Sequence, residues 1–166
     1  MTAEGVLIVD VPVAERPKLD GILEESFEGW YLRHSRRTLM EVELVRAANS
    51  SGAPVGLVML KTLEADVGYV YYIAVARSHR GKGVGGLLLE DALRYFQNAG
   101  MKEVYASVET DNEASEALFR SKGFVKTGFG DVSKKYGGFR AIALYRKMVV
   151  VPGEILLIRD LTSARA

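Results

Sequence analysis

The stretch His79-Arg80-Gly81-Lys82-Gly83-Val84-Gly85-Gly86 joins a β-branched segment, Gly68 to Val75, to an amphipathic helix that stops at Gly100. Apolar residues recur in this helix at spacings of three and four, which is typical of one buried face. They are Gly85, Leu88, Leu89, Ala92, Leu93 and Phe96. Because Glu103 to Glu109 then has the composition of another strand, the stretch predicts a central β-α-β unit.

The glycine turn has the chemistry of an anion site. Glycines let a backbone approach a ligand closely, and the first amides of a helix lack partners within the helix. The helix dipole adds about half a positive charge there, and Arg80 and Lys82 add whole charges. The turn therefore predicts a phosphate site, the alternative being a flexible turn with incidental basic residues.

Two other phosphate ligands are less well supported. Gly81, Gly83 and Gly86 fit the Gly-x-Gly-x-x-Gly pattern of dinucleotide sites, and Glu109 ends the next strand where a ribose partner is wanted. However, the turn follows the fourth predicted strand, and too little chain remains for a full doubly wound sheet. The sequence also has no Gly-x-x-x-x-Gly-Lys-Ser/Thr loop for a nucleoside triphosphate.

Composition excludes several classes of protein. The chain has 166 residues, no cysteine and a net charge of +1, so we predict no nucleic-acid partner, no disulfide scaffold and no metal site. No apolar run approaches the roughly 20 residues that span a bilayer, so we predict no membrane partner and a soluble, cytoplasmic protein. Without repeats or linkers, residues 1–166 are expected to form a single domain with a frayed tail from about residue 159 to 166.

The rest of the chain predicts a mixed α/β fold with about seven strands and about four helices. Two helices are expected over residues 16–38, divided at Gly29, and another over residues 112–122, ending at Gly123. A loop is expected at Asp131 to Gly138. The expected strands, besides those named above, are Gly5 to Val13, Glu41 to Ala47, Val55 to Leu63, Phe124 to Phe129, Ala141 to Val150 and a short one at Ile155 to Ile158.

Two motifs carry a resemblance to a known family. Arg80-x-x-Gly83-x-Gly85, after Ile73-Ala74-Val75, resembles the acyl-coenzyme-A (acyl-CoA) motif of the GNAT N-acetyltransferases. Downstream, Asn112-x-x-Ser115-x-x-Leu118-Phe119-x-x-x-Gly123-Phe124 is similar to a second block of that family. The resemblance covers residues 70–129 and implies a sheet splayed between the fourth and fifth strands.

The resemblance implies acetyl-CoA as the donor and a set of residues that bind it. The turn amides would hold the pyrophosphate, and the fourth strand would pair with the pantetheine arm as if with another strand. Asn112 would contact the arm or its phosphates, although either Asp111 or Asn112 could simply cap the helix. The implied contacts are Ile73, Ala74, Val75, Arg80, Gly81, Lys82, Gly83, Val84, Gly85, Gly86, Asn112, Ser115 and Phe119.

The implied reaction is direct acetyl transfer to a primary amine of a small molecule, a protein lysine or a protein N-terminus. It needs a neutral amine and a proton for the leaving thiolate. The family often places a tyrosine acid where this chain has Phe119, so we expect a substitute, Tyr71 in preference to Tyr72, Tyr105 or Tyr136.

The usual general base is also missing from its expected position. Ser107 stands at one usual position, so we expect Glu109, of the same strand parity, with Glu64 and Asp66 as alternatives. The basic cluster Arg33, His34, Arg36 and Arg37 would select an acidic acceptor, contact the adenosine phosphates or form a solvated helix face. Because the usual acid is missing, a non-catalytic acyl-CoA-binding module is the alternative function, followed by a dinucleotide-binding oxidoreductase. A homodimer stays open.

Overall fold

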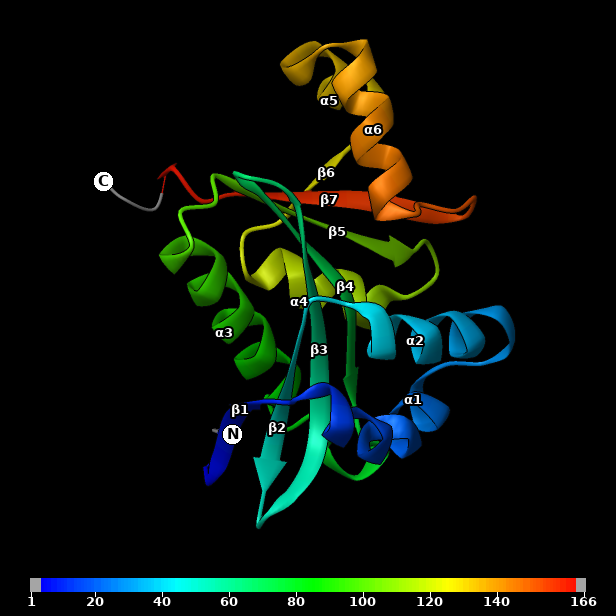
Figure 1. The fold of residues 1–166 in the computed structure, drawn as a ribbon, viewed down its shortest axis with the longest axis vertical. Coiled ribbons are helices and arrows are strands. Elements are labelled where there is room, and N and C mark those ends of the chain that lie inside the picture. Colours follow the sequence, from blue (N-terminus) through cyan, green and yellow to red (C-terminus); the bar gives the residue numbers. More distant parts are fainter. Residues whose placement is uncertain (1–3, 164–166) are drawn as a thin grey trace. The chain divides into compact units, whose positions relative to one another are not determined.

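The computed structural model describes residues 4–163 and has one mixed sheet with strand order β1-β2-β3-β4-β5-β7-β6 (Figure 1). The strands are β1 (Val6–Asp10), β2 (Leu44–Ser50), β3 (Ala53–Glu64), β4 (Val67–Val75), β5 (Glu103–Glu109), β6 (Val125–Thr127) and β7 (Glu154–Asp160). The α-helices are α1 (Asp20–Ser26), α2 (Gly29–Glu41), α3 (Val84–Asn98), α4 (Glu113–Ser121), α5 (Phe129–Tyr136) and α6 (Gly138–Met148). Two short 3₁₀ helices are η1 (Val13–Leu19) and η2 (Arg77–His79). The predicted mixed seven-stranded fold is confirmed, with more helices in the described residues than the expected four.

The chain divides into two compact units. Unit 1 comprises the chain up to Lys61 together with Tyr72–Arg94, and unit 2 comprises Thr62–Tyr71 together with the chain from Tyr95 onward. Strands β3 and β4 and helix α3 each contribute residues to both units. None of the helices in the described residues is both long and apolar enough to cross a membrane.

Unit 1 is built on antiparallel pairing of β1 with β2 and of β2 with β3. The β2–β3 turn uses Ser51 and Gly52, both with positive φ. The buried guanidinium of Arg16, a residue of η1, donates to the carbonyl oxygens of Leu39 at 2.9 Å and Val42 at 2.8 Å. These bonds satisfy carbonyls at the C-terminal end of α2 and fix that end against η1.

Glycines let α3 approach the sheet closely. A Cβ atom at Gly56 of β3 would lie 3.0 Å from Leu88 Cδ1 and 3.1 Å from Val84 Cγ1. Farther along the helix, a Cβ atom at Gly68 of β4 would lie 2.6 Å from the Phe96 ring. Leu88 and Phe96 are fully buried, so the apolar stripe predicted for this helix is confirmed.

Unit 2 pairs β5 with two strands. The parallel pairing with β4 runs from Val67↔Glu103 to Val70↔Ala106. By contrast, the antiparallel pairing with β7 extends from Glu103↔Asp160 to Glu109↔Glu154. Among the described pairs, β5 therefore contacts β4 over its first half only, which agrees with the predicted splay of these two strands.

The segment between β6 and β7 differs from the prediction. The expected strand at Ala141 to Val150 is wrong, because that segment forms α6, and the expected loop at Asp131 to Gly138 is wrong, because most of it forms α5. Ala141, Leu144 and Met148 are the buried residues of α6, and their spacing of three and four is helical. Helix formers such as Ala, Leu, Arg, Lys and Met fill the segment, so propensity and burial agree.

The last strand is longer than predicted. Ile155 to Ile158 is the centre of β7, which continues through Asp160, and Leu161 beyond it is 2% exposed. The expected frayed tail is therefore wrong for its first residues, which pair with β5, while residues 164–166 lie outside the described chain.

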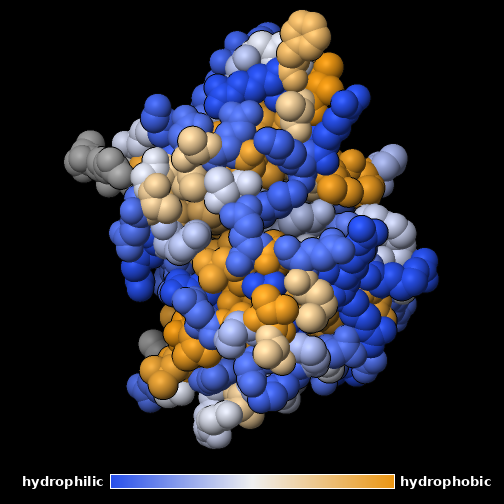
Figure 2. Space-filling model, in the orientation of Figure 1, coloured by the Kyte–Doolittle hydropathy of each residue, from blue (hydrophilic) through white to orange (hydrophobic). Residues whose placement is uncertain are grey.

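Helices α5 and α6 pack on the sheet of unit 2. One apolar cluster joins Tyr69, Tyr105 and Leu156 of the strands to helix residues, and Tyr71 packs at its margin. The buried helix residues of this cluster are Val132, Ala141, Leu144 and Met148. Apolar side chains also reach the surface of these helices: Phe139 is 95% exposed. Figure 2 shows hydrophobic residues among the hydrophilic ones on the molecular surface.

Candidate functional site

The glycine turn of unit 1 presents backbone amides at the start of α3. Gly81 and Gly83 have φ values of 71° and 83°, which side chains rarely adopt. The first helical hydrogen bond runs from Leu87 N to Gly83 O, at 3.1 Å. The amides of residues 84–86 therefore precede the hydrogen-bonded helix, as at any helix start, and the anion site stays a prediction for this turn.

Arg80 braces this turn. Its guanidinium donates to Val75 O at 2.9 Å and to Glu25 O at 2.8 Å, and lies 3.3 Å from Ser26 Oγ. These contacts join the turn to the end of β4 and to α1, all within unit 1. Lys82, by contrast, is exposed in the turn, so its charge is available to a ligand.

The end of β4 lies next to this turn. Ile73 and Val75 are half-buried and Ala74 is 4% exposed. Ala76 N donates to Val55 O at 2.8 Å, which fixes the strand against β3. The implied pantetheine-pairing segment and the implied pyrophosphate turn are thus consecutive parts of one unit, held together by Arg80.

Unit 2 contains predicted site residues at the β5–α4 junction and within α4. Asn112 Oδ1 accepts a hydrogen bond from Ser115 N at 3.1 Å, so Asn112 is the N-cap of α4. Asn112 N donates to Glu109 O at 3.0 Å. Phe119 is 2% exposed and its ring meets that of Phe124 edge-on at 5.0 Å, which gives it a packing role.

Tyr71 and Glu109 lie in unit 2 with different neighbours. The Tyr71 ring meets the buried Tyr69 ring edge-on at 5.3 Å. Glu109 lies opposite Glu154 in the antiparallel β5–β7 register. The sequence analysis did not identify Glu154 as a candidate residue. Tyr69 was missed too: its hydroxyl lies 2.9 Å from Ser107 Oγ, and burial raises its pKa.

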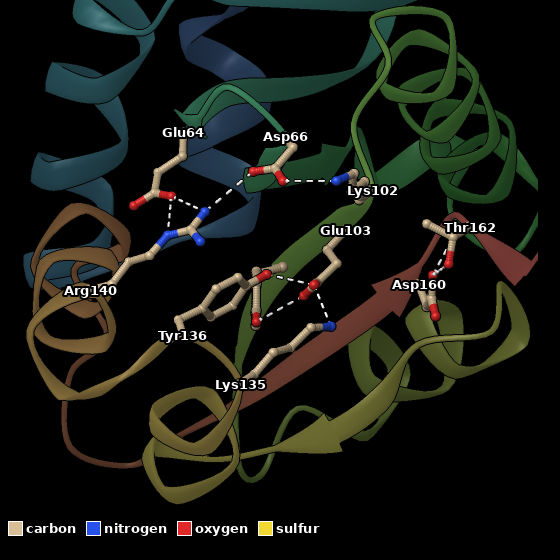
Figure 3. Close-up of polar contacts among 10 residues, drawn as sticks. Glu64, Asp66, Lys102, Glu103, Lys135, Tyr136, Arg140, Asp160 and Thr162 are labelled. Atoms are coloured by element: carbon tan, nitrogen blue, oxygen red, sulfur yellow. Dashed lines mark hydrogen bonds and ion pairs between the residues drawn. The ribbon is translucent and has the colours of Figure 1, made fainter.

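The other tyrosine candidates in unit 2 are held by a buried carboxylate (Figure 3). Glu103, 4% exposed, accepts hydrogen bonds from Tyr105 at 3.1 Å and Tyr136 at 2.5 Å, and pairs with Lys135. Burial, with Glu103 next in effect, raises the pKa of both hydroxyls. Tyr105 and Tyr136 therefore fix α5 to β5 and are poor proton donors.

The alternative bases are also held in ion pairs. Arg140 of α6 donates to Glu64 Oε2 at 2.5 Å and lies 3.4 Å from Asp66 Oδ1 (Figure 3). Lys102 adds a contact to Asp66 at 3.7 Å. These carboxylates therefore fix α6 to the β3–β4 turn within unit 2.

In the basic cluster on α2, Arg36 and Arg37 form ion pairs, His34 contacts a tyrosine, and Arg33 is exposed. Arg36 donates to Asp20 Oδ1 at 2.6 Å and Oδ2 at 2.7 Å, which lowers the pKa of Asp20. Arg37 pairs with Glu41 at 3.0 Å. His34 instead places Nδ1 2.7 Å from the hydroxyl of Tyr72 on β4. Because 38 positions separate His34 and Tyr72, no local sequence signal could have predicted this contact.

Solved structures share this fold. The Escherichia coli ribosomal-protein-S18-alanine N-acetyltransferase matches with a TM-score of 0.71 at 16% identity, covering 94% of each chain. A GNAT family acetyltransferase from Elizabethkingia anophelis with acetyl-CoA bound matches with a TM-score of 0.70 at 18% identity, covering 95% of this chain and 99% of that one. At these identities the likeness shows a shared mixed α/β fold and nothing about activity.

Sequence comparison is more specific. Residues 10–124 match the acetyltransferase (GNAT) family, so this chain belongs to that family. The N-alpha-acetyltransferase RimI of Mycobacterium tuberculosis is 37% identical over 84 residues, which cover 49% of this chain and 51% of that one. The mycothiol acetyltransferase of Corynebacterium efficiens is 33% identical over 70 residues, which cover 42% of this chain and 24% of that one. The chain thus matches about half of the first relative's length and a quarter of the second's.

Proposed function

We propose that this chain is an N-acetyltransferase that moves the acetyl group of acetyl-CoA to a primary amine by direct transfer. The observation that carries the proposal is the start of α3, where positive-φ glycines lead into the amides of residues 84–86. Family membership supports it independently.

Acetyl-CoA fits the residues present in unit 1. The turn from Arg80 to Gly86 offers amides and the charge of Lys82 to the pyrophosphate, and a Cβ atom at Gly81 would meet nothing within 4 Å, so the turn is open. Ile73 to Val75 would pair with the amides of the pantetheine arm. Bound acetyl-CoA would supply an activated acyl group. Asn112, Ser115 and Phe119 stay predicted contacts in unit 2.

The acceptor is proposed to be an amine of low pKa. A lysine amine, with a pKa near ~10.4, needs a strong base at neutral pH, whereas an α-amine near ~8 needs much less help. The side chain of Phe119 has no acidic proton to donate, and that of Ser107 is not a general base. These two residues therefore favour an α-amine over a lysine amine as the acceptor. Relatives named N-alpha-acetyltransferase support a polypeptide N-terminus, and those named mycothiol acetyltransferase support a small molecule.

Glu109 and Tyr71 stay the base and acid predicted from the sequence. A single domain, a cytoplasmic location and a homodimer also stay predictions.

The test is an acceptor screen that follows free thiol. Wild type is incubated with acetyl-CoA and a panel of peptides with free or blocked N-termini, lysine peptides and small amines. We expect thiol release with free α-amines and none with blocked ones. Bound acetyl-CoA without turnover across the panel would favour a non-catalytic module, and binding of NAD in place of acetyl-CoA would favour the oxidoreductase.

A further inference from the structure

The sheet has two edge strands that differ in length and composition. β6 ends the sheet in unit 2 with three residues, and its central Lys126 pairs with Glu116 at 3.5 Å. Short edges and lysines are common protections against pairing with another chain. β1 ends the sheet in unit 1 with five residues, Val6–Asp10 (Figure 1). It contains neither lysine nor proline, and among the described strands it pairs with β2 alone. β1 therefore lacks the protections of β6.

The backbone of β1 directs every second residue towards the open edge. Val11 N donates to Val45 O at 2.8 Å, and this pair continues the β1–β2 register. Because bonded and non-bonded pairs alternate in an antiparallel ladder, Leu7 and Val9 also bond to β2. The residues between them direct their N–H and C=O groups away from β2. They are Val6, Ile8 and Asp10.

The side chains of β1 make this edge apolar. Leu7 is 71% exposed and Val9 is 38% exposed. Val9 lies opposite the buried Ala47 in the β1–β2 register, and Leu7 shares its face because it is two positions away. These two side chains therefore extend the apolar face of the sheet to its outer edge. The one charge of β1, on Asp10, accepts a hydrogen bond from Arg46 at 2.7 Å.

We propose that β1 pairs antiparallel with β1 of a second copy of this chain, about a two-fold axis at Ile8. Ile8 then exchanges both of its backbone hydrogen bonds with the partner's Ile8, and Val6 does so with the partner's Asp10. Non-bonded pairs bring side chains closest together, so Leu7 packs against the partner's Val9. All the outward backbone groups of β1 are satisfied in this arrangement. The proposal is independent of the acetyltransferase function.

Self-complementarity identifies the occupant and the register. A two-fold contact requires each residue to meet a compatible residue of the same strand. In the register centred on Ile8, the charge of Asp10 faces the partner's Val6, so no like charges meet. A register centred on Leu7 would place Asp10 opposite the partner's Glu4, which is repulsive. One centred on Val9 would place Val6 opposite the partner's Pro12, which has no N–H to donate.

Sedimentation velocity over a range of protein concentrations tests the pairing. We expect wild type to form a reversible dimer, because a contact through one strand is small. Ile8→Pro removes an outward N–H, and Leu7→Lys places a charge beside the partner's Val9, so each should raise the dimer Kd by at least about tenfold. Leu7→Lys changes an exposed side chain and keeps the test valid if Ile8→Pro is less stable, which circular dichroism checks.

Phe139→Lys is the matched control, because it removes an apolar side chain that is 95% exposed on α6. It should dimerise like wild type. A wild type that is monomeric at every concentration would overturn the proposal. A dimer that Phe139→Lys abolishes and Leu7→Lys leaves intact would also overturn it, because the contact would then lie on α6.

Amide hydrogen exchange follows the two sets of backbone groups separately. The amides of Leu7 and Val9 should exchange slowly at every concentration, since they bond to β2. Those of Ile8 and Asp10 should slow only as the dimer forms, and should stay fast in Leu7→Lys. Fast exchange of Ile8 and Asp10 at every concentration would contradict the pairing. Slowing of these amides in a monomer by a peptide of the acceptor screen would assign the edge to another polypeptide and overturn the second copy.

Discussion

Two tyrosines on β4 have different surroundings. Tyr69, in unit 2, is 1% exposed, and its hydroxyl lies 2.9 Å from Ser107 Oγ. Tyr72, in unit 1, is half-buried and lies 2.7 Å from His34 Nδ1. The comparison extends to two charged residues: Glu103 of unit 2 holds a helix on the sheet, whereas Arg80 of unit 1 braces an open turn. Changes at the glycine turn should therefore alter binding, and changes at Glu103 should alter stability.

The largest expected effect is the loss of acetyl-CoA binding in Gly83→Glu. The carboxylate would clash with the pyrophosphate and repel it at the start of α3, so calorimetry should detect no binding. Gly52→Glu is the matched control, because Gly52, like Gly83, lies in unit 1 and has a positive φ. It should bear a similar backbone strain and bind acetyl-CoA like wild type. Equal affinity of both variants would show that the turn is not the phosphate site.

A smaller effect is expected in unit 2 from Glu103→Ala. Removing this carboxylate leaves the hydroxyls of Tyr105 and Tyr136 without their acceptor, which should lower the free energy of unfolding by about 3 kcal/mol. Urea unfolding measures the loss, and hydrogen exchange should locate it in α5 and α6. The exposed Glu113→Ala is the control and should change little. A Glu103→Ala variant as stable as wild type would show that Glu103 does not stabilise the packing of the helices on the sheet.

The smallest effect is the share of the alkaline pH dependence that a single buried tyrosine carries. The pKa values of Tyr69, Tyr105 and Tyr136 are raised in the folded state, chiefly by burial. Groups of this kind contribute their full stability below the unfolded value near ~10 and lose it as pH rises towards the folded value. Urea unfolding should therefore show a fall in stability between about pH 9.5 and 11, and Tyr105→Phe should flatten it. Equal stability across that window would contradict the burial of these hydroxyls.

The units also differ in how well the sequence predicts them. In α3 the apolar spacing, the preceding glycine turn and Gly100, with a φ of 79°, all agree, and the helix was predicted correctly. Gly123, with a φ of 81°, likewise ends α4 as expected. At α3 and α4 the apolar spacing and the glycines predict the same helices, so the tertiary packing agrees with the local sequence.

The secondary-structure prediction for the segment from Phe129 to Met148 was wrong, because the sequence patterns in that segment conflict. Ile142 and Leu144 alternate as in a strand, and the glycines at 137 and 138 read as a loop. The helical spacing of Ala141, Leu144 and Met148 was present but short, and only packing against Tyr69 and Tyr105 makes it decisive.

The candidate site likewise contains features that the local sequence predicts and features that depend on tertiary packing. The turn could be predicted because a local motif defines it. The pairing of His34 with Tyr72 could not, because it depends on how α2 packs against β4, and strand parity alone favoured Tyr71. The role of Asn112 as an N-cap was one of two stated alternatives, and the geometry confirms that role.

The most direct test of acetyl-CoA at the glycine turn is a titration that follows the backbone amides of residues 84–86 by nuclear magnetic resonance. Acetyl-CoA and coenzyme A should shift these amides strongly, with smaller shifts at Ile73 to Val75, while NAD should leave them unchanged. Amides that do not respond to acetyl-CoA, or that respond equally to NAD, would contradict the assignment of this turn.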